Sequence, residues 1–120
     1  MLNFVSMIWN LIAVAAGGAL GATGRYLLTV AMTGQPLVAT LIANVVGSLV
    51  IGVAIGSVQG RMLLFLSVGL CGGFTTFSTF SNQTLTLIQS GNWLGATAYA
   101  AGSVLLCGLA TLAGYALSKF

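Results

Sequence analysis

The chain has 120 residues, of which 58% are hydrophobic and 2% are charged, and it contains no aspartate, glutamate or histidine. No soluble domain keeps a surface so poor in charge, so the composition indicates an all-α integral membrane protein. Without carboxylates or imidazoles the usual general bases are missing, which argues against a hydrolytic enzyme and against proton-coupled transport. The cations Arg25, Arg61 and Lys119 form no cluster that could neutralise a row of phosphates, so nucleic-acid binding is not expected.

A helix of about 20 apolar residues crosses a bilayer, and the sequence contains four apolar runs of sufficient length. Transmembrane helices are predicted over about 4–32, 37–58, 62–89 and 93–117, in a single domain of residues 1–120. In the third helix, two glycines followed by two threonines predict a break near 72–76. Such a break is tolerated in a membrane only where it is buried in protein or lines a polar cavity, so it indicates an ion site or pathway.

Small residues recur at four-residue spacing in three of these helices: Gly17 and Gly21, Gly52 and Gly56, Gly69 and Gly73. Such pairs let helix backbones approach closely, because lipid gives no hydrophobic drive for helix association. The pattern predicts tight helix packing and does not by itself indicate a function.

Four spans place both termini on one side of the membrane, with Arg61 and Lys119 on one side and Arg25 toward the other. This bias of about one charge is too weak to orient the chain firmly. Two interpretations follow from charge alone. Either the chain inserts both ways and pairs antiparallel with itself, or other factors set a single orientation.

Polar side chains follow helical spacing on three helices. The stripes are Thr40, Asn44 and Ser48; Thr76, Thr79, Asn82, Gln83 and Thr86; and Tyr99, Ser103, Cys107 and Thr111. A lone serine or threonine in a membrane helix usually bonds its own backbone, but three stripes in one small chain favour a wetted path. The path offers hydrogen-bond donors and no carboxylates, which suits an anion. The positive edges of the Phe77 and Phe80 rings could also face an anion. Packing against core or lipid is the simpler interpretation of these phenylalanines.

Arg25 lies among apolar residues and has two interpretations. Its side chain could snorkel to the headgroups, or it could be a fixed vestibule charge that attracts anions.

Three stretches in order resemble the Fluc/CrcB family of fluoride ion channels, and the resemblance covers essentially the whole chain. They are GGALGATGRY at 17–26, TLIANVVGS at 40–48 and GLCGGFTTFSTF at 69–80.

The resemblance implies a dual-topology, antiparallel homodimer with two pores in the inner (plasma) membrane, through which fluoride leaves the cytoplasm passively. It implies that a structural Na⁺ at the dimer centre is held by backbone carbonyls of Gly72 and Thr75. The predicted fluoride pathway comprises Asn44, Phe77, Phe80, Thr79, Gln83, Tyr99, Ser103 and Thr111.

Two positions depart from the family pattern. Gln83 stands where the family usually has glutamate, and Cys107 stands where a serine-like donor is expected. Glutamine keeps the size and removes the charge. We expect conduction to survive because hydroxyls and amides still line the path, and the missing serine-like donor weakens Cys107 as a site residue.

Two other classes compete with the channel. A small multidrug-resistance-type cation exporter shares the four-span architecture but needs a membrane-embedded glutamate in its first helix, where this chain has only Arg25. A structural subunit of a larger membrane complex would not need three aligned polar stripes.

Overall fold

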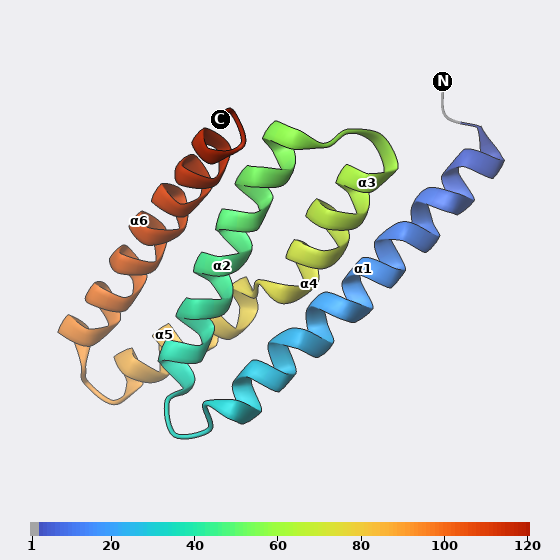
Figure 1. Cartoon of the computed structure of the whole chain (residues 1–120). Coiled ribbons are helices and arrows are strands. Elements are labelled where there is room, and N and C mark those ends of the chain that lie inside the picture. The colour runs from blue at the N-terminus through green and yellow to red at the C-terminus, as the bar shows by residue number, and fades with distance from the viewer. Residues whose placement is uncertain (1–2) are drawn as a thin grey trace.

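The computed structural model describes residues 3–120 as a bundle of helices that run back and forth along one axis (Figure 1). The elements are α1 (Phe4–Ala31), α2 (Pro36–Ser57), α3 (Gly60–Leu64), the π-helical η1 (Phe65–Cys71), α4 (Gly72–Phe74), α5 (Phe77–Gln89) and α6 (Trp93–Leu117). α3, η1 and α4 follow one another without interruption, and with α5 they form the third of four stretches that are apolar and long enough to cross a membrane. The predicted all-α architecture with a broken third helix is therefore confirmed. Residues 1 and 2 of the predicted domain lie outside the described part.

The helices begin where the sequence offers a cap. The side-chain oxygen of Asn3 accepts from the Ser6 amide at 2.7 Å, and that of Asn92 accepts from the Gly95 amide at 2.8 Å. Pro36 occupies the first turn of α2, where its missing N–H needs no partner. α3 begins at Gly60, two residues before the predicted start, because Gly60 adopts a φ of +66° that turns the chain into the helix.

Two close-packed helix pairs hold the bundle together. α2 packs mainly on α6, and α1 packs on η1 and α4. In the first pair, a Cβ on Gly52 would lie 2.9 Å from the Tyr115 nitrogen, and a Cβ on Gly114 would lie 3.0 Å from the Val53 nitrogen. In the second pair, a Cβ on Gly21 would lie 2.7 Å from the Phe74 nitrogen. These glycines bring the backbones together as membrane helices require.

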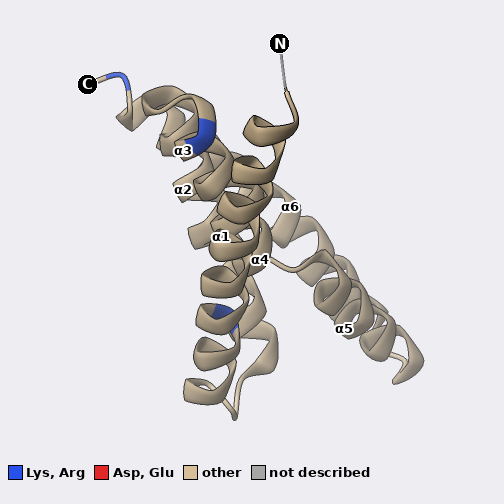
Figure 2. Ribbon diagram, turned by 90° about the vertical axis from the view of Figure 1, so that its right-hand side faces the viewer, with Lys and Arg blue, Asp and Glu red and all other residues tan. Residues whose placement is uncertain are grey.

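The interior consists of small residues. The buried apolar side chains are Ala39, Ala43, Ala54, Cys71 and Ala96, whereas most large apolar side chains face outward. This arrangement suits a protein whose large side chains meet lipid. The start of α1 and the C-terminus lie at the same end, and the cationic segments lie at the C-terminal tail, at α3 and on the opposite half of α1 (Figure 2).

The close contact between α2 and α6 gives a stability prediction. Gly114→Ala would push a methyl group into the Leu49 carbonyl and the Val53 amide of α2, so we expect the free energy of unfolding to fall by about 1–3 kcal/mol. Gly108→Ala on the same helix is the matched control, because its Cβ would meet nothing within 4 Å and alanine favours a helix over glycine. Unfolding in detergent micelles measures both, and equal stability of the two variants would contradict the packing.

Candidate functional site

The third span is broken at Thr75 and Thr76, which connect α4 to α5 in extended conformation. Thr75 has φ −81° and ψ 157°, and Thr76 has φ −148° and ψ 111°. The last helical bonds before the break run from the amide and hydroxyl of Thr75 to the Cys71 carbonyl, at 2.9 and 2.8 Å. The backbone groups at the break therefore need partners from elsewhere, because lipid supplies none.

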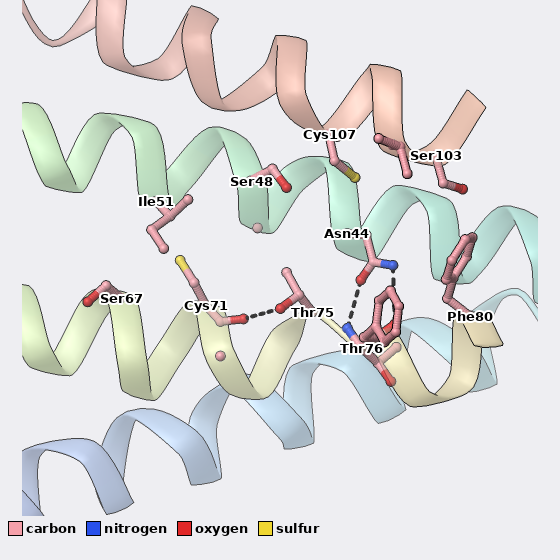
Figure 3. A pocket seen from close by; sticks show the side chains of 14 residues that line it. Asn44, Ser48, Ile51, Ser67, Cys71, Thr75, Thr76, Phe80, Ser103 and Cys107 are labelled. Carbon is pink, nitrogen blue, oxygen red and sulfur yellow. Dashed lines mark hydrogen bonds between the residues drawn. The ribbon is translucent and has the colours of Figure 1, made fainter. Parts of the chain in front are cut away.

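Asn44 on α2 satisfies the backbone at the break from both sides. Its side-chain oxygen accepts from the Thr76 amide at 2.7 Å, and its Nδ2 donates to the Thr76 carbonyl at 3.2 Å. Figure 3 shows the asparagine side chain lying directly opposite this residue. One amide therefore takes the place of the two ladder bonds that Thr76 would make in a helix.

Arg25 on α1 provides the next partner. Its Nε donates to the Gly73 carbonyl at 3.2 Å in a partly buried contact. The hydroxyl of Thr76 then caps α5, accepting from the Thr79 amide at 3.2 Å and donating to the Thr79 hydroxyl at 3.0 Å. Side chains from α1, α2 and the break itself thus hold the two halves of the span in place.

A cavity of about 340 Å³ opens beside the break, between α2, η1 and α6 (Figure 3). Most of its wall is apolar, with a small number of hydroxyl, amide and thiol groups. The lining residues are Asn44, Gly47, Ser48, Ile51, Ser67, Cys71, Gly72, Thr75, Thr76, Phe77, Phe80, Ser103, Val104 and Cys107.

Ser103 has an unusual position in this wall. Its side chain is 6% exposed, and its Oγ is the one buried side-chain polar atom among the described residues that has no hydrogen-bond partner. Leaving a buried hydroxyl unpaired costs about 1–3 kcal/mol. The orphaned hydroxyl therefore points to a ligand or water in the cavity.

Three of the other hydroxyls in the stripes bond a backbone carbonyl of their own helix. Thr40 donates to the Pro36 carbonyl, Thr86 to the Asn82 carbonyl and Thr111 to the Cys107 carbonyl, at 3.0 to 3.1 Å. Thr111 also lies 3.1 Å from the Ser48 carbonyl and joins α6 to α2. These residues support helix packing in this structure, whereas Ser103 does not.

An aromatic row runs from the cavity along the first half of α5 to α6. The rings of Phe77 and Phe80 are 5.6 Å apart, and those of Phe80 and Tyr99 are 5.2 Å apart, both tilted. Beyond them the Tyr99 hydroxyl donates to the Gln83 side-chain oxygen at 2.6 Å, and Gln83 Nε2 donates to the Pro36 carbonyl at 3.2 Å. Gln83 thus links α5 to both α2 and α6.

The structure brings together only part of the predicted pathway. Asn44, Phe77, Phe80 and Ser103 line the cavity, as do the expected Na⁺ ligands Gly72 and Thr75. The other predicted residues lie outside its lining: Thr79 at the α5 cap, Gln83 and Tyr99 at the end of the aromatic row, Thr111 between α2 and α6, and Arg25 behind the break.

Sequence reasoning missed several members of the wall. Cys107, which was a weak candidate for want of a serine-like donor, lines the cavity because it lies one turn along α6 from Ser103. Ser67 and Cys71 belong to η1, and nothing in the sequence signalled that this segment would be π-helical. The four-residue spacing of Ser103 and Cys107 was the one available signal.

Comparison with known proteins extends over most of the chain. The profile of the family described as "CrcB-like protein, Camphor Resistance (CrcB)" matches residues 12–115. A protein of Paramagnetospirillum magneticum is 47% identical over 114 positions, covering 85% of this chain and 89% of the relative. One of Nitrobacter winogradskyi is 47% identical over 120 positions, covering 90% and 94%. One of Shewanella baltica is 42% identical over 108 positions, covering 82% and 86%. All three relatives are named fluoride-specific ion channel FluC.

The double contact of Asn44 gives a prediction about the break. Asn44→Ala would leave the Thr76 amide and carbonyl without partners in an apolar setting, so we expect the free energy of unfolding to fall by about 2–4 kcal/mol. Asn82→Ala is the matched control, because the Asn82 side chain is exposed, and we expect a change of at most about 0.5 kcal/mol. Denaturant unfolding in micelles decides, and similar losses in both variants would show that the amide does not support the break.

Proposed function

This chain belongs to the CrcB-like family, and on that premise we propose that it is a channel through which fluoride leaves the cytoplasm. Its four apolar spans make it a multi-pass membrane protein, and its bacterial relatives place it in the inner membrane. The names of the relatives identify the ion as fluoride. The polar groups of the cavity are the residues that we propose conduct it.

The single observation that supports a pathway at this cavity is the Ser103 hydroxyl. It is buried and has no partner among the described residues, so its proton is available to an ion in the cavity. A bare anion must replace its hydration shell with donors, and a hydrogen bond to a charged group is stronger than one between neutral groups. Fluoride at this hydroxyl would remove the penalty of an orphaned group and gain a charge-assisted bond.

The remaining polar groups of the wall are neutral. The chain has no carboxylate side chain that could repel an anion or attract a cation. Phe77 and Phe80 line the same space, and the edges of their rings carry the positive part of the ring quadrupole. A wall of hydroxyls, together with any aromatic edge turned toward the ion, would favour an anion by its electrostatic potential while remaining mostly apolar.

Passive flow is part of the proposal. A proton-coupled transporter relays protons through Asp, Glu or His, and this chain has none of these. A multidrug exporter needs a membrane-embedded glutamate, and a hydrolase needs a general base such as Asp, Glu or His. The chain has none of these side chains. The chain's own residues are proposed to bind and orient the ion and to catalyse no reaction.

We further propose that two copies assemble antiparallel. Phe77 is 78% exposed although it belongs to the cavity wall, so a second copy placed against this side would complete the enclosure. Both orientations of the chain are compatible with its charge, because two cationic segments lie near one end of the molecule and a third lies on the opposite half of α1 (Figure 2).

A structural Na⁺ at the centre of such a pair fits the backbone at the break. The Thr76 amide donates to Asn44, so the Gly72 carbonyl lacks the donor that a continuous helix would give it. Gly72 is exposed, and the extended conformation of Thr75 turns its carbonyl out of the helical direction. Na⁺ in membrane proteins binds carbonyls of unwound backbone, where it would neutralise their dipoles. Gly72 and Thr75 of both copies would be its ligands.

Fluoride efflux from liposomes tests the proposed pathway. We expect the wild-type protein to release fluoride and not chloride, and Ser103→Ala to lower the fluoride rate by about tenfold, because a charge-assisted hydrogen bond is lost. Ser57→Ala is the control, since the Ser57 hydroxyl is exposed and bonded to the Val53 carbonyl at 2.6 Å. Equal rates in the two variants would remove Ser103 from the pathway.

Gln83 gives a second test in the same assay. We expect the wild type to conduct without a glutamate at this position, because the amide already fixes Tyr99 and the Pro36 carbonyl by hydrogen bonds. Gln83→Glu would keep the bond from Tyr99 but turn a carboxylate oxygen toward the Pro36 carbonyl, so it should not create or restore flux. A silent wild type together with a conducting Gln83→Glu variant would overturn this expectation.

A further inference from the structure

Arg25 lies on the face of α1 that contacts the broken span. Gly17, Gly21 and Arg25 are four residues apart and so share one side of the helix. The two glycines bring α1 against η1 and α4, where a Cβ on Gly17 would lie 2.9 Å from the Gly69 Cα. One turn beyond this contact the arginine side chain reaches the backbone that precedes the break.

The carbonyl that Arg25 reaches is one that the break deprives of its helical donor. In a continuous helix the Gly73 carbonyl would accept from the amide of Phe77, but Phe77 opens α5 on the other side of the extended residues. Arg25 Nε supplies a donor at 3.2 Å from 48 residues away. No carboxylate side chain competes with the Gly73 carbonyl for the Arg25 guanidinium, because the chain contains no aspartate or glutamate.

Holding one carbonyl constrains its neighbours. Successive carbonyls around a single helical turn keep fixed angles to one another, so a clamp on Gly73 also orients the Gly72 carbonyl and the entry into Thr75. Asn44 fixes the other end of the same short segment at Thr76. Arg25 on α1 and Asn44 on α2 therefore hold the two ends of the break from two different helices.

We infer that Arg25 is a positioning residue of the ion pathway, and that it acts through the Nε–H donor to the Gly73 carbonyl and not through its charge. The inference rests on the proposed channel function for its flux measurement, but the contact itself does not depend on that function. It replaces the view of Arg25 as a free vestibule cation, since its Nε is engaged with backbone behind the cavity.

Two substitutions separate the donor from the charge. Arg25→Gln places an N–H donor the same number of bonds from the backbone as Nε and removes the charge. Arg25→Lys keeps the charge but has a methylene at that point, with its ammonium one bond farther along a flexible stem. Arg25→Met, which has neither group, sets the baseline.

The first readout is fluoride efflux from liposomes at low and high ionic strength. We expect Arg25→Gln to retain most of the wild-type rate and Arg25→Lys to fall by about tenfold toward Arg25→Met, because the partly buried Gly73 carbonyl keeps an N–H donor in the first variant and loses it in the second. The ratio of the wild-type rate to the Arg25→Gln rate should not change with salt, whereas a charge that attracts ions would act more weakly at high salt. Equal rates for the Gln and Lys variants, or a higher rate for Lys, overturn the inference.

The second readout does not need flux. Hydrogen exchange of the Thr75–Phe77 amides in micelles should quicken in the Arg25→Lys variant and stay near wild type in Arg25→Gln, with α2 and α6 unchanged in both. A silent wild type in the efflux assay would defeat the channel proposal and leave this comparison to decide the role of Arg25. Uniform exchange at 75–77 across all variants would overturn that role.

Discussion

The structure depends on one constraint, which is that backbone polar groups inside a bilayer must find partners within the protein. Two extended residues, Thr75 and Thr76, interrupt the third span. The Asn44 amide pairs with both backbone groups of Thr76, and Arg25 pairs with the Gly73 carbonyl. The interruption is stable because side chains from two neighbouring helices, α1 and α2, lie level with it and replace the lost backbone hydrogen bonds.

Those side chains reach the break because the helices are very close. Glycines on α1 and α6 let backbones touch, and the buried residues are almost all small. Close approach shortens the distance that a side chain must cover. The hydrogen bonds at the break therefore depend on the glycine contacts between the helices. Large apolar residues are left for the outer surface, where lipid is the solvent.

The cavity beside the break combines an apolar wall with few polar groups. Two hydroxyls of this wall, those of Ser67 and Thr75, already donate to backbone carbonyls one turn earlier in the same span. Ser103 differs from these, because its hydroxyl is buried and has no partner among the described residues, and an unpaired donor in an apolar wall suits the anion pathway proposed above. An ion path built from neutral donors needs only a few such groups, because each unpaired donor in an apolar wall interacts strongly with a charge.

The sequence by itself determined the four spans, the break and the absence of any acidic group, because hydropathy, composition and glycine–threonine runs act locally along the chain. It also supplied the family resemblance. Only the tertiary structure decided which polar side chains face the cavity and which hold helices together, as Ser103 and Thr111 on the same stripe show. It alone placed Arg25 on a carbonyl 48 residues away. Such pairings depend on the rotation and separation of packed helices, which residue spacing within one helix does not encode.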